Sequence, residues 1–107
     1  MADKYDLEIE QLRQNPELIE HHWNMGYLYS QRYPLFQPCA DRRVLNGMFC
    51  GCLTQVKDRK YPAATPELTK AIQADDRIPT LPENITLDML PVFAEWQRRL
   101  DKELGRT

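Results

Sequence analysis

The chain has 107 residues, of which 42% are hydrophobic and 28% are charged, and its formal net charge is −2. This composition is typical of a folded globular protein and excludes a disordered one, and the length predicts a single domain over residues 1–107. No run approaches the roughly 20 apolar residues of a membrane span. Residues 1–10 are acidic and lack the apolar segment of a secretory signal. We therefore expect a cytoplasmic protein that does not contact the membrane.

The first predicted helix covers residues 4–14. Asp3 stands where a helix N-cap is needed, because its carboxylate can accept hydrogen bonds from the free backbone N–H groups. Tyr5, Ile9 and Leu12 follow at helical spacing and form a thin apolar stripe. We expect this stripe to face the core.

The second predicted helix runs from residue 16 to about residue 32. Asn15 can cap its start, and Pro16 suits the first helical position because it lacks a donor that would go unused there. His22 lies on the inner face, which predicts a buried histidine with a hydrogen-bond partner. The whole inner face comprises Leu18, Ile19, His22, Met25, Gly26, Tyr29 and Tyr33.

Residues 41–59 are predicted to form the central helix. One arc is apolar and a separate arc carries only small side chains, so the helix can be packed on both sides. Gly47 and Gly51 are one turn apart on the small arc, which favours close approach by another helix or by a bulky side chain such as Trp23 or Trp96. The apolar arc holds Val44, Leu45, Met48, Phe49, Cys52, Leu53 and Val56, and the small arc holds Gly47, Cys50, Gly51 and Thr54.

A short helix over residues 66–74 and a last helix complete the pattern. The last helix must begin at about residue 87 or later, because Pro91 is tolerated only in its first turn. Its polar face is expected to include Asp101. Its apolar stripe contains Met89, Phe93, Trp96, Leu100 and Leu104. The irregular segment 75–85 is expected to pack through Ile78, Leu81 and Ile85.

These elements predict an all-α fold, namely a compact single-domain bundle of four main helices plus one short helix, joined by proline-rich links. No stretch fits a strand template. The largest apolar surface should be buried where the central helix meets the last helix. This predicted core sets Leu45, Met48, Phe49, Cys52 and Val56 against Phe93, Trp96 and Leu100.

Candidate catalytic and metal-binding motifs do not have the required spacing. Cys50 and Cys52 are two residues apart on a helix and diverge by about 200°, so one metal ion cannot bind both. His21 and His22 diverge by about 100°. There is no nucleophile motif and no glycine-rich phosphate loop. We therefore expect no enzyme activity, no metal, no cofactor and three free thiols.

The best candidate for a functional surface is the aromatic-rich segment 23–36. Trp, Tyr and Arg are the residue types that dominate binding hot spots. Tyr27 and Leu28 fall outside the inner face of their helix and point to a second contact surface. The alternative is that another helix of the same chain covers them. The predicted partner-binding residues are Trp23, Tyr27, Leu28, Arg32, Arg42 and Arg43.

The function expected from this pattern is binding to another protein, as an inhibitor, adaptor or regulatory subunit. Small inhibitors encoded by phages and mobile elements have this profile. Acidic residues prevail over residues 1–30 and basic ones over residues 31–61. The two are either solvated faces that attract each other within the fold, or the basic one is a patch for an acidic partner surface or nucleic acid. One alternative is a nucleic-acid-binding module that uses the basic 42–60 region, although the isoelectric point near 5.6 argues against it. The other is a small metal-dependent protein or enzyme, with a zinc site at Glu17, His21 and Cys39.

Overall fold

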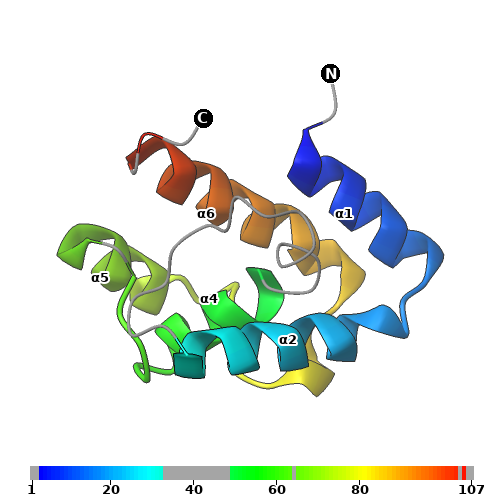
Figure 1. Ribbon diagram of the computed structural model, residues 1–107, viewed down its shortest axis with the longest axis horizontal. Coiled ribbons are helices and arrows are strands. Elements are labelled where there is room, and N and C mark those ends of the chain that lie inside the picture. The colour runs from blue at the N-terminus through cyan, green and yellow to red at the C-terminus, as the bar shows by residue number, and fades with distance from the viewer. Residues whose placement is uncertain (1–2, 33–48, 64, 104, 106–107) are drawn as a thin grey trace.

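The computed structural model describes residues 3–32, 49–63, 65–103 and 105, with the backbone alone for Lys4 and Phe49. In these residues there is no strand, so the all-α prediction is confirmed. They form five α-helices rather than four long helices and one short helix (Figure 1). The helices are α1 (Lys4–Gln14), α2 (Leu18–Arg32), α4 (Phe49–Lys57), α5 (Pro66–Ala74) and α6 (Leu90–Glu103), and two 3-10 turns cover Pro82–Asn84 and Leu87–Met89.

The helix ends follow local capping chemistry. Asp3 caps α1 through the N–H groups of Tyr5 and Asp6, as predicted. Pro91 lies in the first turn of α6, also as predicted. The start of α2 differs from the prediction, because Asn15 turns its side-chain amide back to the carbonyl of Gln11 at the end of α1. The helix therefore begins at Leu18 rather than at residue 16.

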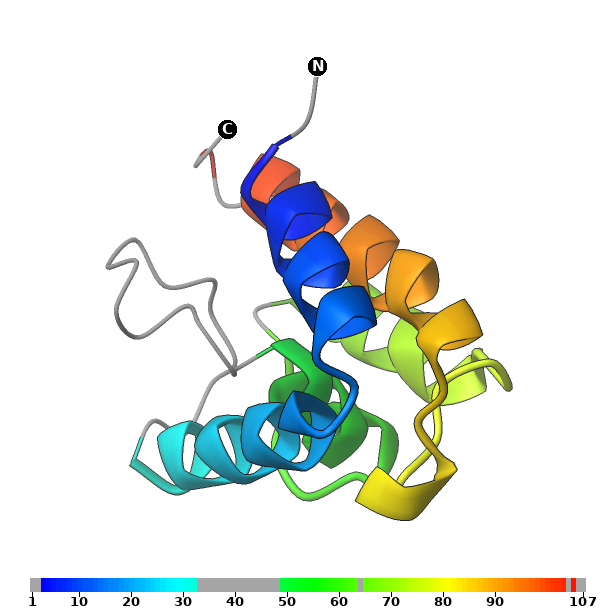
Figure 2. The same ribbon diagram turned by 90° about the vertical axis from the view of Figure 1, so that its right-hand side faces the viewer.

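The helices α1 and α6 lie side by side and run in opposite directions (Figures 1 and 2). The Tyr5 hydroxyl donates to Asp101 Oδ2 at 2.7 Å in the buried part of this contact. Arg98 pairs with both Asp3 and Asp6 at 2.7 Å at its exposed edge. Asp101 was predicted on the polar face and is instead buried, because Tyr5 supplies the hydrogen bond that a buried carboxylate needs.

The most extensive helix pairing is between α2 and α4, where two glycines meet. A Cβ atom on Gly51 would stand 2.2 Å from the carbonyl oxygen of Trp23 and 2.8 Å from the Cα atom of Gly26. The backbones approach this closely only because neither glycine carries a side chain. The predicted close approach at Gly51 is thus confirmed, with α2 as the crossing helix, while Gly47 lies outside the described residues.

The helix α4 is the centre of the fold. Every residue from Cys50 to Val56 is buried, since α2 packs on one side and α5 and α6 pack on others. The prediction that α4 is packed on both faces is correct. The prediction that it pairs mainly with α6 is wrong, because the glycine contact brings α2 closer. The predicted core residues Cys52, Val56, Phe93, Trp96 and Leu100 are buried, whereas Leu45, Met48 and the Phe49 side chain lie outside the description.

The turn after α5 is fixed to α6 by one carboxylate. Asp75 Oδ2 accepts hydrogen bonds from Trp96 Nε1 and Arg77 Nη2, both at 2.8 Å. The hydrogen bond from the Arg77 guanidinium holds the pKa of Asp75 well below its usual range. Downstream, Ile78 and Ile85 are buried as predicted. Leu81 was predicted to pack as well, but it is 49% exposed, because it leads into a 3-10 turn that buries none of its own residues.

No helix in the described ranges combines the length and the hydrophobicity needed to cross a membrane.

The glycine contact gives a direct stability prediction. Gly51→Ala places a methyl group against the α2 backbone, so we expect the free energy of unfolding to fall by about 1–3 kcal/mol or more, although alanine normally favours a helix. Gly105→Ala is the control. Nothing lies within 4 Å of that position, and only its φ of 70° is unfavourable, so the expected loss is about 1 kcal/mol. Urea denaturation measures the free energy of unfolding of both variants. A Gly51→Ala protein as stable as the wild type would refute the close approach of α2 and α4.

The Asp75 contact gives a pH-dependent prediction. Since the folded-state pKa is lowered, the stabilisation is present at neutral pH and is lost as the pH falls below about 4, where the unfolded carboxylate becomes protonated. We expect Asp75→Asn to lower the free energy of unfolding by about 1–2 kcal/mol at pH 7, and the difference from wild type to shrink towards pH 2. Asp76→Asn is the matched control, because that side chain is fully exposed. Equal effects of the two substitutions in denaturant titrations would contradict this account.

Candidate functional site

The predicted partner surface lies on the C-terminal half of α2. Leu28 is 58% exposed and is one of three large apolar side chains that stand out in this way among the described residues. Arg32 follows one turn later on the same face and is also exposed. The structure therefore brings an apolar side chain and a cation together on one strip of helix surface.

A second row of α2 residues lies beside this strip. The rings of Trp23 and Tyr27 are one turn apart and stack with their centroids 5.4 Å apart and an angle of 9° between planes. Both side chains are half-buried. Stacked aromatic pairs of this kind are stabilised by about 0.5–1.5 kcal/mol beyond the area they bury.

The α2–α4 crossing positions the stack. Gly51 faces the backbone of Trp23, Gly26 and Tyr27, so α2 cannot slide or rotate on α4 without a clash. The Trp23 side chain packs against the hydrophobic core with its Nε1 atom buried, so the stack lies at the edge of the core. Ser30 is buried beneath and donates its hydroxyl to the Tyr27 carbonyl at 2.7 Å.

The connector after α4 adds a cation that was not predicted as part of the site. Lys60 Nζ lies 6.0 Å from the centre of the Tyr27 ring, at the outer limit of a cation–π contact. Arg59 adopts a left-handed conformation with φ of 64°, which ends α4 and turns the chain back. Lys60 also pairs with Asp58 at 3.3 Å. No pattern in the sequence links Lys60 to Tyr27, because the contact depends on how α2 and α4 pack.

The remaining predicted residues, Arg42 and Arg43, lie outside the described residues. The α2 surface is defined here as Trp23, Tyr27, Leu28, Arg32 and Lys60.

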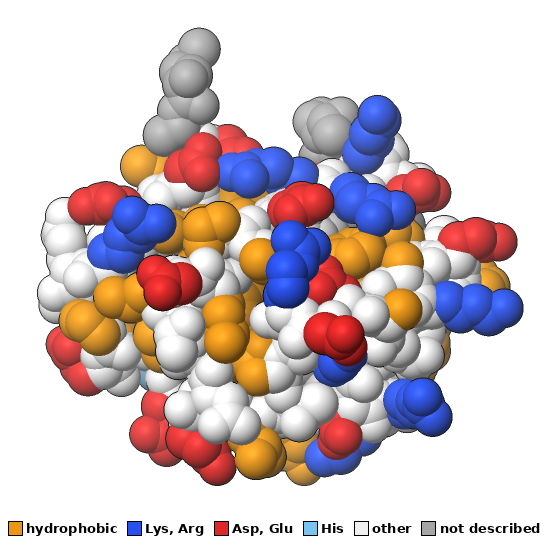
Figure 3. All heavy atoms as spheres, turned by 180° about the vertical axis from the view of Figure 1, so that it is seen from behind, with side chains coloured by type: hydrophobic (Ala, Val, Ile, Leu, Met, Phe, Trp, Pro, Cys, Tyr) orange, Lys and Arg blue, Asp and Glu red, His pale blue; other side chains and the backbone are white. Residues whose placement is uncertain are grey.

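The described residues include only the second part of the basic 42–60 region, from residue 49 onward. Lys57 Nζ donates to the carbonyl of Gln73 at 2.8 Å and its side chain is 16% exposed, so its charge is used inside the fold. On the face seen in Figure 3, acidic and basic side chains are interspersed rather than grouped by sign. That face therefore carries no continuous basic patch of the kind found on nucleic-acid-binding surfaces.

One buried polar pair has the residue types of a catalytic or metal site. Glu8 Oε2 and His22 Nε2 are 3.0 Å apart, and their side chains are 9% and 6% exposed. The buried histidine with a hydrogen-bond partner is thus confirmed. Both groups face other side chains rather than solvent, and the contact joins α1 to α2, so we interpret it as structural.

In the described ranges, no arrangement of side chains suits metal binding or a reactive thiol. No group of three or more His, Cys, Asp or Glu side chains there is close enough to hold a metal ion. Cys50 and Cys52 are both free and buried. Burial raises the pKa of the Cys50 thiol far above its usual range, with a smaller contribution from the charge of Glu8. A thiol in this environment is a poor nucleophile at neutral pH.

The buried thiols can be tested chemically. In a Cys39→Ser variant, which retains only Cys50 and Cys52, we expect no reaction with a chromogenic disulfide reagent at pH 8 while the protein is folded, because the thiolate form is disfavoured and inaccessible. Both thiols should react once the protein is unfolded in guanidinium. Rapid reaction of either thiol in the folded protein would contradict this assignment.

Comparisons of this chain with protein-family models, with curated proteins and with solved structures find no match.

Proposed function

We propose that this protein is non-catalytic and acts by binding another protein through the α2 surface, as an inhibitor, adaptor or regulatory subunit. The observation that carries the proposal is the exposure of Leu28, at 58%, on the same half of α2 as the Trp23–Tyr27 stack. Trp23, Tyr27 and Arg32 are of the residue types enriched in binding hot spots, and they lie on the same part of α2 as this exposed leucine.

The energetics favour this surface. Full burial of a leucine side chain stabilises by about 1.5–3 kcal/mol, and Leu28 retains more than half of its surface for a partner to cover. The stacked rings are already ordered, so a partner that packs on them loses little side-chain entropy on binding. A surface of this type binds through a few central contacts rather than through its whole area.

The charge of the α2 surface favours an acidic partner. Arg32 and Lys60 place positive charge at its rim, and rim charges mainly raise the rate of association. Protein is favoured over nucleic acid because Lys57 is engaged with Gln73 and because the isoelectric point is near 5.6. We place this activity in the cytoplasm, where the free thiols of Cys50 and Cys52 stay reduced.

A single substitution tests the role of this surface separately from the stability of the rest of the molecule. Leu28→Ser should weaken binding to the cellular partner at least ten-fold and leave the melting temperature unchanged, because Leu28 makes its main apolar contact only in the complex. Leu7→Ser is the matched control, since Leu7 is 56% exposed on α1 and should not affect binding. Tyr27→Ala is less informative, because it also removes the stack with Trp23.

The measurement has two stages. Affinity capture from the native host with wild-type, Leu28→Ser and Leu7→Ser baits identifies proteins lost only with Leu28→Ser, and calorimetry with the purified partner then gives the affinities. If both leucine variants retain the same partners as the wild type, the α2 surface is not the binding site. Capture of nucleic acid that is lost as salt rises would favour the alternative function.

A further inference from the structure

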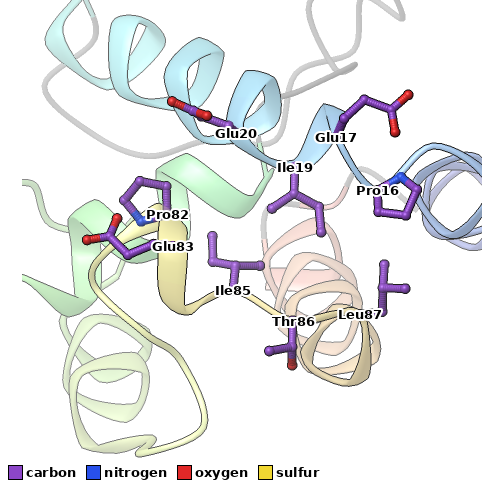
Figure 4. A pocket seen from close by; sticks show the side chains of 9 residues that line it. All are labelled: Pro16, Glu17, Ile19, Glu20, Pro82, Glu83, Ile85, Thr86 and Leu87. Carbon is purple, nitrogen blue, oxygen red and sulfur yellow. The ribbon is translucent and has the colours of Figure 1, made fainter.

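A groove lies between the start of α2 and the segment 82–87, at the opposite end of α2 from Leu28 (Figure 4). It is shallow and open and has a volume of about 420 Å³. Two segments distant in sequence form it: the α1–α2 turn with the first turn of α2, and the stretch that holds the two 3-10 turns. The lining residues are Pro16, Glu17, Ile19, Glu20, Pro82, Glu83, Ile85, Thr86 and Leu87.

The floor of the groove is apolar. Ile19 extends from α2 towards Ile85 on the facing segment, and Leu87 stands beside them (Figure 4). Ile19 and Ile85 retain 9% and 7% of their surface, and Leu87 is half-buried. Pro16 and Pro82, at the two ends, carry no backbone N–H. The apolar surface left open on the floor is therefore small and comes mainly from Leu87.

The rim of the groove is acidic. Glu17, Glu20 and Glu83 are exposed, with Glu20 and Glu83 on one side and Glu17 on the other (Figure 4). Within the described ranges, no cation pairs with any of the three. Asp3 and Asp75, by contrast, each pair with an arginine of the same chain. The negative charge around this apolar floor is thus left for an external cation to balance.

We propose that this groove binds a short extended segment of a partner protein in which lysine or arginine residues flank apolar side chains. The apolar side chains would cover Ile19, Ile85 and Leu87, while the cations would reach the three carboxylates. A metal ion does not fit, because the carboxylates are not close enough to share one. A small anionic ligand is excluded by the charge of the rim.

This groove is independent of the α2 surface. Ile19 and Leu28 are nine residues apart on one helix, which separates them by roughly 14 Å along its axis. The two surfaces also differ in the charge of their side chains, since the groove has three glutamates and the α2 surface has Arg32 and Lys60. The protein would therefore hold two segments of opposite charge at the two ends of one helix, and the groove can bind its ligand whether or not the α2 surface has a partner.

A synthetic peptide tests the groove directly. The probe is a short fluorescein-labelled peptide in which lysine and leucine alternate, and binding is followed by fluorescence anisotropy. We expect saturable binding, with amide shifts in nuclear magnetic resonance spectra confined to the residues around Ile19, Ile85 and Leu87. Two control peptides, one with glutamate in place of lysine and one with serine in place of leucine, should not bind.

Charge-neutral variants locate the site. Glu20→Gln combined with Glu83→Gln should weaken binding of the lysine–leucine peptide roughly five-fold, as expected for two exposed ion pairs. Glu10→Gln combined with Glu67→Gln changes the net charge equally at exposed positions outside the groove and should leave binding unchanged. All four positions are exposed, so both variants should fold, which thermal melting checks.

Three results would overturn the proposal. The first is equal weakening by the two double variants, which would show attraction to the overall charge of the protein. The second is amide shifts centred on Leu28 or elsewhere outside the groove. The third is self-association in sedimentation equilibrium that the Glu20→Gln/Glu83→Gln variant abolishes, which would show that a second copy of this chain occupies the groove.

Discussion

The fold depends on the contact between Gly26 of α2 and Gly51 of α4. Because neither residue has a side chain, the two helix backbones meet directly, and α4 is enclosed so completely that its residues from Cys50 to Val56 are all buried. The same contact determines what α2 presents to solvent. With its inner side against α4, the helix leaves Leu28 exposed and keeps the Trp23–Tyr27 stack at the edge of the core, and its first turn faces the segment 82–87. Both proposed binding surfaces are therefore consequences of one helix crossing.

Much of the fold was predictable because it depends on residues close together in the sequence. Asp3 and Thr65 cap their helices, and Pro91 limits the start of α6, through contacts within a few residues. Apolar periodicity identified Tyr5, Ile9 and Leu12 as buried for the same reason. The small face of the central helix predicted that something would approach Gly51, although the sequence did not determine whether a helix or a side chain would fill that space.

Most of the incorrect and missing predictions involve a partner far away in the chain. Asp101 was assigned to solvent because its hydrogen-bond donor, Tyr5, lies 96 residues earlier. Glu8 is buried against His22, although charged residues are rarely placed in a core. Lys60 reaches Tyr27 only because α2 and α4 cross, and Leu81 is exposed because of the turn that follows it. Four of the five residues of the α2 surface were thus predicted from composition, whereas the contact of Lys60 with Tyr27 required the tertiary structure.

The number of residues that separates the two partners of each contact bears on the order in which the molecule folds. The α2–α4 crossing joins residues 26 apart, as in the Cys52–Gly26 hydrogen bond, whereas the α1–α6 pairing joins Tyr5 to a residue 96 away. Closing the longer loop costs about 1 kcal/mol more in chain entropy, so the crossing is expected to form in the folding nucleus and α1 to dock later. Loss of the Tyr5 hydroxyl should then accelerate unfolding in a chevron plot and leave the folding rate nearly unchanged. A nascent chain would in that case assemble the helix pair that carries Leu28 before α1 joins α6.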